Sequence, residues 1–142
     1  MNKDQVFFVG QKAFIRNTKG EVLVLYDEKI GLDLPGGKVQ SGEQDLIYSL
    51  KREVEEETKL KINVKQPFYT WVFNYPFQEK GLDKRTDGNL YLVGYKCELL
   101  SGEVLLSDEH VSSEWVSKDN YKRLIKKGGH FKALDYYFNS SY

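Results

Sequence analysis

The sequence has a single cysteine, only three prolines, no excess of either charge and no long apolar run. Because Cys97 is alone, no disulfide can form within the chain, and we expect a cytoplasmic location. Lys and Arg equal Asp and Glu at 21 each, whereas nucleic-acid binding needs a basic excess, so we expect no nucleic-acid partner. We also expect no membrane partner, because no stretch is apolar enough for a signal core or a membrane span.

The 142 residues are 40% apolar and 30% charged, which is ordinary for a globular protein with a real core. Apolar residues at 6–15 and 22–26 flank the turn signal at 17–21 and predict a hairpin. The second run is apolar throughout, so its strand should be buried on both faces. The glycine-rich segment 31–43 predicts a loop, and a helix should follow over 45–59.

Beyond this helix, periodicity and turn residues predict strands at 61–75, 90–100 and 112–117 and helices at 118–128 and 130–138. The polar segment 76–89 is long for a connection, and such loops are often functional. Strands, one central helix, more strands and a C-terminal helix predict a mixed α/β or α+β sandwich. We expect it to form a single domain over residues 1–142.

The stretch "EVEEE", residues 53–57, places four glutamates within five residues. At about 100° per helical residue, Glu53, Glu56 and Glu57 share one arc, whereas Glu55 points to solvent. That arc overlaps the edge of an apolar stripe formed by Leu46, Ile47, Leu50 and Val54. Partial burial and mutual repulsion would raise the pKa values of these carboxylates. Mg²⁺ or Mn²⁺, which prefers such oxygens, would relieve the repulsion; a plain exposed acidic face is the alternative.

Two glycines stand in the loop before this helix. Gly36 and Gly37 permit positive φ and close approach of the backbone, so a bare carbonyl there can add a further metal ligand. Arg52 lies four residues before Glu56, within reach on a helix. The same guanidinium can also orient an acid of the loop, such as Glu43.

These residues resemble the Nudix box, G-x5-E-x7-R-E-U-x-E-E-x-G-U, in which U is aliphatic. Gly37 and Glu43 match its first spacing, after a typical "LPGG" at 34–37. Its second half is matched by Arg52, Glu53, Val54, Glu56, Glu57 and Leu60. Eight residues instead of seven separate Glu43 from Arg52, so Gln44 competes for the motif position, and Lys59 replaces the last glycine. The resemblance implies an α/β/α sandwich with a mixed sheet and a central catalytic helix.

The resemblance also implies the chemistry. Similar enzymes hydrolyse the diphosphate linkage of a nucleoside diphosphate joined to another moiety, so the expected substrate is a nucleoside triphosphate or an ADP-ribose-like nucleotide. The implied ligands of Mg²⁺ or Mn²⁺ are Gly37, Glu53, Glu56 and Glu57. Arg52 would orient the acids, and the general base would be Glu53 or an acid of a later loop, Glu109 or Asp108. An ordinary surface acid is the alternative for Glu109.

A hypothesis of a different class is a Nudix-like sensor that binds a nucleotide without turnover. The inserted residue and Lys59 would permit such a protein. The intact Arg52 and its neighbouring glutamates favour the enzyme, since a pure binding protein need not retain them. We expect a monomer or a homodimer.

Recognition of the base is expected to involve aromatic side chains. The candidates are Trp71, Phe73, Tyr75 and Trp115. The first three alternate as on one face of a strand, and core packing is the alternative to base stacking for each. His110 and His130 are not expected to bind metal, because they are isolated from any Cys/His cluster.

Overall fold

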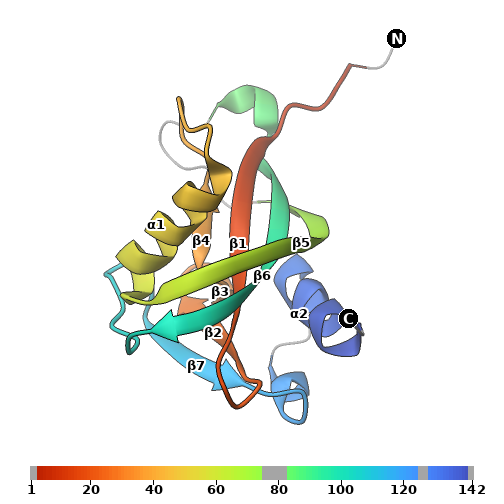
Figure 1. Cartoon of the computed structure of the whole chain (residues 1–142). Coiled ribbons are helices and arrows are strands. Elements are labelled where there is room, and N and C mark those ends of the chain that lie inside the picture. The colour runs from red at the N-terminus through yellow and green to blue at the C-terminus, as the bar shows by residue number, and fades with distance from the viewer. Residues whose placement is uncertain (1–2, 75–82, 125–127, 141–142) are drawn as a thin grey trace.

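The computed structural model describes residues 3–74, 83–124 and 128–140. Its centre is a seven-stranded sheet, and helices α1 (Leu46–Thr58) and α2 (Gly129–Asn139) cover opposite faces of that sheet (Figure 1). This arrangement confirms the predicted α/β/α sandwich with a central helix. No helix among the described residues is long and apolar enough to cross a bilayer.

The sheet is mixed, as predicted. Its strands are β1 (Phe8–Arg16), β2 (Val22–Asp27), β3 (Gly31–Asp33), β4 (Gly36–Lys38), β5 (Lys61–Asn74), β6 (Asn89–Ser101) and β7 (Ser112–Val116). Their order is β3-β2-β1-β6-β5, with β4 also paired to β1 and β7 to β2. Only the pairing of β1 with β6 is parallel among these strands. The segment 76–89 is described only from residue 83, where it forms the short 3₁₀ helix η1 (Lys84–Thr86).

The core lies on both faces of the central strands. Alternate side chains of β2 point to opposite faces, so Val24 packs into the layer beneath α2 while Leu23 and Leu25 pack into the layer beneath α1. Phe14 and Ile15 divide between the same two layers. The prediction of a strand buried on both faces is therefore confirmed.

Helix α1 begins and ends close to the predicted bounds. The side chain of Asp45 caps it by accepting a hydrogen bond of 3.0 Å from the Tyr48 amide. Lys59 ends it with φ of 64°, a left-handed conformation that glycine adopts at lower cost. The predicted apolar stripe is wrong at its first turn, where Leu46 and Ile47 are 37% and 40% exposed. The buried face begins only at Ser49, because the first turn lies beyond the core layer.

The segment 31–43 is not a simple loop, which corrects the prediction. It contains β3 and β4, and Gly36 of β4 pairs with Lys12 of β1. A Cβ at Gly36 would lie 1.9 Å from the Gln11 carbonyl oxygen, so the glycine allows two backbones to approach at a distance that a side chain would prevent. The motif glycines thus form a strand pair in addition to a turn.

The helix predicted over 118–128 is also wrong within the described residues. The chain forms only a 3₁₀ turn, η2 (Tyr121–Arg123), and Leu124 is extended with ψ of 162°. Tyr121 is buried, and its hydroxyl donates a hydrogen bond of 2.6 Å to Asp135 of α2. Tyr121 therefore packs against α2 where the sequence predicted a longer helix. Residues 125–127 lie outside the described part of the chain.

Candidate active site

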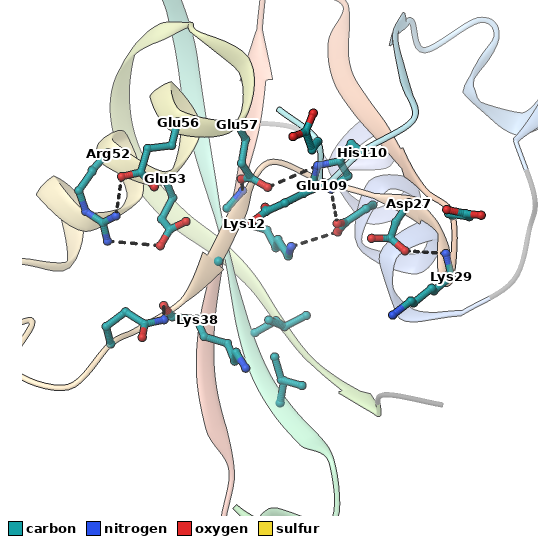
Figure 2. Close-up of a pocket in the computed structure, with 18 residues that line it drawn as sticks. Lys12, Asp27, Lys29, Lys38, Arg52, Glu53, Glu56, Glu57, Glu109 and His110 are labelled. Atoms are coloured by element: carbon teal, nitrogen blue, oxygen red, sulfur yellow. Dashed lines mark hydrogen bonds and ion pairs between the residues drawn. The ribbon is translucent and has the colours of Figure 1, made fainter. Parts of the chain in front are cut away.

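A cleft of ≈ 680 Å³ lies between α1, β4, the start of β6 and the loop before β7 (Figure 2). Its walls carry eight carboxylates against four Lys or Arg side chains. A polyphosphate entering this cleft would be repelled unless cations accompanied it. The arrangement therefore suits an anionic substrate only in combination with a metal ion.

Arg52 organises the carboxylates on the exposed side of the cleft, as the sequence predicts. Its Nη1 lies 2.9 Å from Glu56 Oε1, and its Nη2 lies 3.3 Å from Glu53 Oε1 (Figure 2). Nη2 also donates to Glu43 Oε2 at 3.1 Å. One guanidinium thus fixes three acids without occupying the centre of the cleft.

The extra residue of the motif is accommodated in the loop before α1. Glu43 reaches Arg52, accepts a hydrogen bond from the Ser49 hydroxyl, and accepts another of 2.7 Å from the Gln40 amide. The hydrogen bond from Ser49, followed by those from Gln40 and Arg52, lowers the pKa of Glu43. Gln44 is exposed. Of the two candidates, Glu43 is the one that contacts the arginine.

Glu57 is the most buried acid of α1, with a side chain only 6% exposed. The Gly36 amide donates a hydrogen bond of 2.8 Å to its Oε1. Burial raises the pKa of Glu57 to about 7, although the charge of Lys12 and the Gly36 hydrogen bond oppose the shift. Without a cation this carboxylate is costly to ionise.

Glu53 lies against Gly37. A Cβ at Gly37 would lie 2.8 Å from Glu53 Oε2, so the glycine leaves the space in which this carboxylate sits. Partial burial raises the pKa of Glu53, and the negative charges of Glu56 and Glu109 add to the shift. The side chain of Glu56 is 59% exposed and lines the same cleft.

Glu55 points away from the other acids of α1, as the helical wheel predicts. Its carboxylate is 3.5 Å from Lys61 Nζ, and the residue does not line the cleft. Glu53, Glu56 and Glu57 are therefore brought together, whereas Glu55 is not. Together with the space at Gly37, these oxygen donors fit a hard divalent cation.

A buried charge network beside the cleft was not predicted. At its centre is Asp33, whose Oδ1 lies 3.0 Å from Lys12 Nζ and 3.4 Å from His130 Nε2. Its Oδ2 lies 2.9 Å from His110 Nε2. Burial raises the pKa of Asp33, but the charge of Lys12 and the hydrogen bonds from both histidines outweigh burial and hold that pKa well below its usual range. Trp71 Nε1 completes the network by donating to His130 Nδ1 at 3.1 Å.

The sequence carried a weak signal for this network. Lys12 stands alone in the apolar stretch "VGQKAFI", and Asp33 is flanked by leucines in "LDLP". An isolated charge in an apolar setting needs a partner when it is buried. Reasoning from Cys/His clusters alone overlooked the carboxylates as partners for His110 and His130.

The loop before β7 brings two further groups to the acids of α1. Glu57, Glu109 and His110 each offer one ligand atom, and these atoms lie within 4.8 Å of one another. Asp27, Asp33 and His110 form a second group of this kind. Glu109 thus lies at the cleft and not on a remote surface loop. The lack of a Cys/His cluster does not isolate His110, because carboxylates surround it.

The aromatic candidates that the structure describes do not line the cleft. Trp71 is buried in the core layer beneath α2, and Phe73 stacks on His130 with ring centroids 4.5 Å apart. Trp115 packs in the layer beneath α1. None of these three lines the cleft among the described residues, and Tyr75 lies outside the described part of the chain. Leu90 and Leu92 provide its apolar lining instead.

Comparisons with known proteins support the resemblance. The family model of the NUDIX domain matches residues 7–137. A MutT protein from Methanosarcina mazei Go1 has a TM-score of 0.76 and 26% identity, covering 97% of this chain and 96% of that chain. An Ap4A hydrolase from C. elegans has a TM-score of 0.71 and 16% identity, covering 92% and 94%.

A third structure, an ADP-ribose pyrophosphatase from Streptococcus suis 89-1591, has a TM-score of 0.59 and 24% identity, covering 81% of this chain and 77% of that chain. A comparison with curated protein sequences gives no match. The family match extends over nearly the whole chain and includes the acids of α1 and the loop that carries His110. The chain therefore belongs to the NUDIX family of pyrophosphohydrolases.

Proposed function

We propose that this protein is a divalent-metal-dependent hydrolase that cleaves the diphosphate linkage of a nucleoside diphosphate joined to another moiety. The observation that carries the proposal is the set of three acids on α1 at one wall of a cleft in which carboxylates outnumber cationic side chains. Such a cleft can accept a polyphosphate only with its charge neutralised. When bound, Mg²⁺ or Mn²⁺ would neutralise phosphoryl charge and make bound water more acidic.

Each residue of the cleft has a proposed part in this activity. Glu53, Glu56 and Glu57 hold the metal, together with the backbone of Gly37. Arg52 positions Glu53 and Glu56 through the contacts of 3.3 Å and 2.9 Å. These contacts place the carboxylates before the substrate arrives, which reduces the reorganisation that binding would require.

The general base is proposed to be Glu53 or Glu109. Both carboxylates line the cleft, and the negative charge of Glu109 adds to the upward shift in the pKa of Glu53. A raised pKa makes a carboxylate a better proton acceptor near neutral pH. Substitution of each acid by glutamine, with pH profiles of kcat, separates the two.

Substrates are proposed to be nucleoside triphosphates or ADP-ribose-like nucleotides. The names of the similar structures include hydrolases of Ap4A and ADP-ribose, which contain the proposed type of linkage. Leu90 and Leu92 offer apolar contact next to the acids, where the sugar or base can lie. A single domain over residues 1–142, a cytoplasmic location and a monomer or homodimer stay predictions.

A hydrolysis screen, in which chromatography separates each substrate from its nucleotide products, tests the proposal. Nucleoside triphosphates, ADP-ribose, nucleotide sugars and dinucleoside polyphosphates are each incubated with the protein and Mg²⁺, Mn²⁺ or EDTA. We expect turnover of at least one class that EDTA abolishes. Calorimetric binding of a nucleotide without hydrolysis of any would instead identify a sensor, and turnover undiminished by EDTA would exclude the proposed metal.

A further inference from the structure

We propose that His110 binds the metal of this cleft directly through Nδ1, alongside Glu57 and Glu109, so that the site contains a nitrogen ligand. This inference rests on the proposed metal-dependent function and adds a ligand to it. The ligand set derived from the sequence consists only of oxygens. An imidazole in the set alters which metals the site prefers.

The orientation of His110 is fixed from one side. Its Nε2 lies 2.9 Å from Asp33 Oδ2, a hydrogen-bond distance at which Nε2 carries the proton. In the neutral imidazole, the form that binds metal, this arrangement leaves a lone pair on Nδ1. Metal-binding histidines commonly donate their other ring nitrogen to a carboxylate in this way, which fixes the tautomer and raises the basicity of the ligand.

The free nitrogen is buried and faces the acids. His110 is 8% exposed, and Nδ1 has no hydrogen-bond partner among the described residues. It lies 3.6 Å from Glu57 Oε2, longer than a hydrogen bond (Figure 2). Two neighbouring ligands of one octahedral ion at about 2.1 Å are about 3 Å apart, so a small movement admits an ion between them. A buried polar atom is costly without a partner, and a bound cation would supply one for Nδ1.

The backbone holds this loop over the end of α1. The Leu105 amide donates to the Thr58 carbonyl at 3.0 Å, and the Ser107 amide donates to the Glu57 carbonyl at 3.1 Å. These bonds satisfy carbonyls that the end of a helix leaves without partners. They bring Glu109 and His110 to the face of α1 that carries Glu57, so the three ligand atoms converge within 4.8 Å.

Asp33 is itself held firmly, which makes it a suitable partner for a ligand histidine. Lys12 Nζ lies 3.0 Å from one carboxylate oxygen, and His130 approaches the same oxygen at 3.4 Å. Trp71 donates to the other nitrogen of His130, so His130 has a partner for both ring nitrogens. Only His110 directs a nitrogen without a hydrogen-bond partner toward the acids among the two histidines of the chain.

Pulsed electron paramagnetic resonance on the full chain loaded with Mn²⁺ tests the inference. We expect ¹⁴N modulation from a bound imidazole in the wild type. Labelling histidine with ¹⁵N should replace that modulation with the ¹⁵N pattern, which requires no mutation. His110→Gln should remove the nitrogen signal and weaken Mn²⁺ binding about tenfold or more. His130→Gln is the matched control and should keep the signal.

The outcomes separate this inference from the proposed function. Bound Mn²⁺ with no histidine coupling overturns the nitrogen ligand and leaves the question of hydrolysis to the hydrolysis screen. Coupling that disappears in His130→Gln but persists in His110→Gln also overturns the assignment. Histidine coupling together with a silent screen supports the ligand and contradicts the enzyme.

Discussion

The backbone amide of Gly36 donates a hydrogen bond of 2.8 Å to Glu57 Oε1, and this contact ties β4 to the buried acid of α1. Gly36 also lets β4 pack against β1, because a Cβ at this position would lie 1.9 Å from the Gln11 carbonyl oxygen. The two glycines of the motif therefore have different parts: Gly36 allows the strand pairing, and Gly37 leaves space for Glu53.

Gly37→Ala should lower turnover with little loss of stability. The added Cβ would lie 2.8 Å from Glu53 Oε2, and a carboxylate at the end of a flexible side chain can move aside. Moving it displaces a proposed metal ligand, so we expect kcat to fall about tenfold or more, since 1.4 kcal/mol of barrier suffices for that change. Gly36→Ala is the contrast, because its Cβ meets backbone and should lower the thermal midpoint. A fully active Gly37→Ala would remove Glu53 from the ligand set.

Glu43→Gln should lower activity, though less than loss of a metal ligand. Glu43 supports Arg52 at 3.1 Å, so its removal loosens the guanidinium that orients Glu53 and Glu56. Steady-state kinetics of Glu43→Gln and Gln44→Ala decide the alignment. Near-wild-type rates in both variants would mean that neither residue contributes to activity as the motif glutamate.

Glu57→Gln should stabilise the metal-free protein above about pH 5. The folded pKa of Glu57 is raised to about 7 from 4.5, so the folded state binds more protons than the unfolded state between these values. The contribution of Glu57 to the free energy of unfolding is therefore highest at low pH, where Glu57 is neutral in both states, and it falls as pH rises toward 7. A shift of this size corresponds to about 3 kcal/mol as an upper bound.

Urea unfolding in EDTA at pH 5 and pH 8 measures this effect. The informative quantity is the difference between wild type and Glu57→Gln. Burial lowers the pKa of His110, but its hydrogen bond to Asp33 outweighs burial and raises that pKa, so both proteins lose stability at higher pH. We expect the difference to grow with pH. A difference independent of pH would show that Glu57 titrates normally in the fold.

Trp71→Phe should lower stability and leave KM nearly unchanged. The substitution removes the indole donor that lies 3.1 Å from His130 Nδ1, and a buried acceptor without a partner costs about 1–3 kcal/mol. Trp115→Phe, on the other face of the sheet, is a control for the loss of ring area. KM and the thermal midpoint are measured together. A severalfold rise in KM with an unchanged midpoint would assign Trp71 to base stacking instead.

Features set by local spacing could be predicted from the sequence. A periodicity of 3.6 residues predicts helix α1 and the convergence of Glu53, Glu56 and Glu57. It also predicts that Glu55 points away from the cleft, and the structure has all of these features. Strands β3 and β4 were missed because these short, glycine-containing segments pair with β2 and β1, respectively, only once the sheet exists.

The network around Asp33 lay beyond such reasoning. Its members are at positions 12, 33, 110 and 130, and no local pattern relates residues that far apart. Their proximity depends on β1, β3 and α2 meeting in three dimensions. Exposure of Leu46 likewise depends on where the core ends and not on helical phase.

The comparison of Glu56→Gln with Glu55→Gln at saturating Mg²⁺ tests the central claim most directly. Glu56 lines the cleft and contacts Arg52 at 2.9 Å, whereas the neighbouring Glu55 faces Lys61. A metal ligand is worth several kcal/mol in the transition state, so kcat of Glu56→Gln should fall about 100-fold or more with the thermal midpoint preserved. Glu55→Gln should retain the wild-type kcat. Wild-type turnover in Glu56→Gln, or an equal loss in both variants, would contradict a metal held by this face of α1.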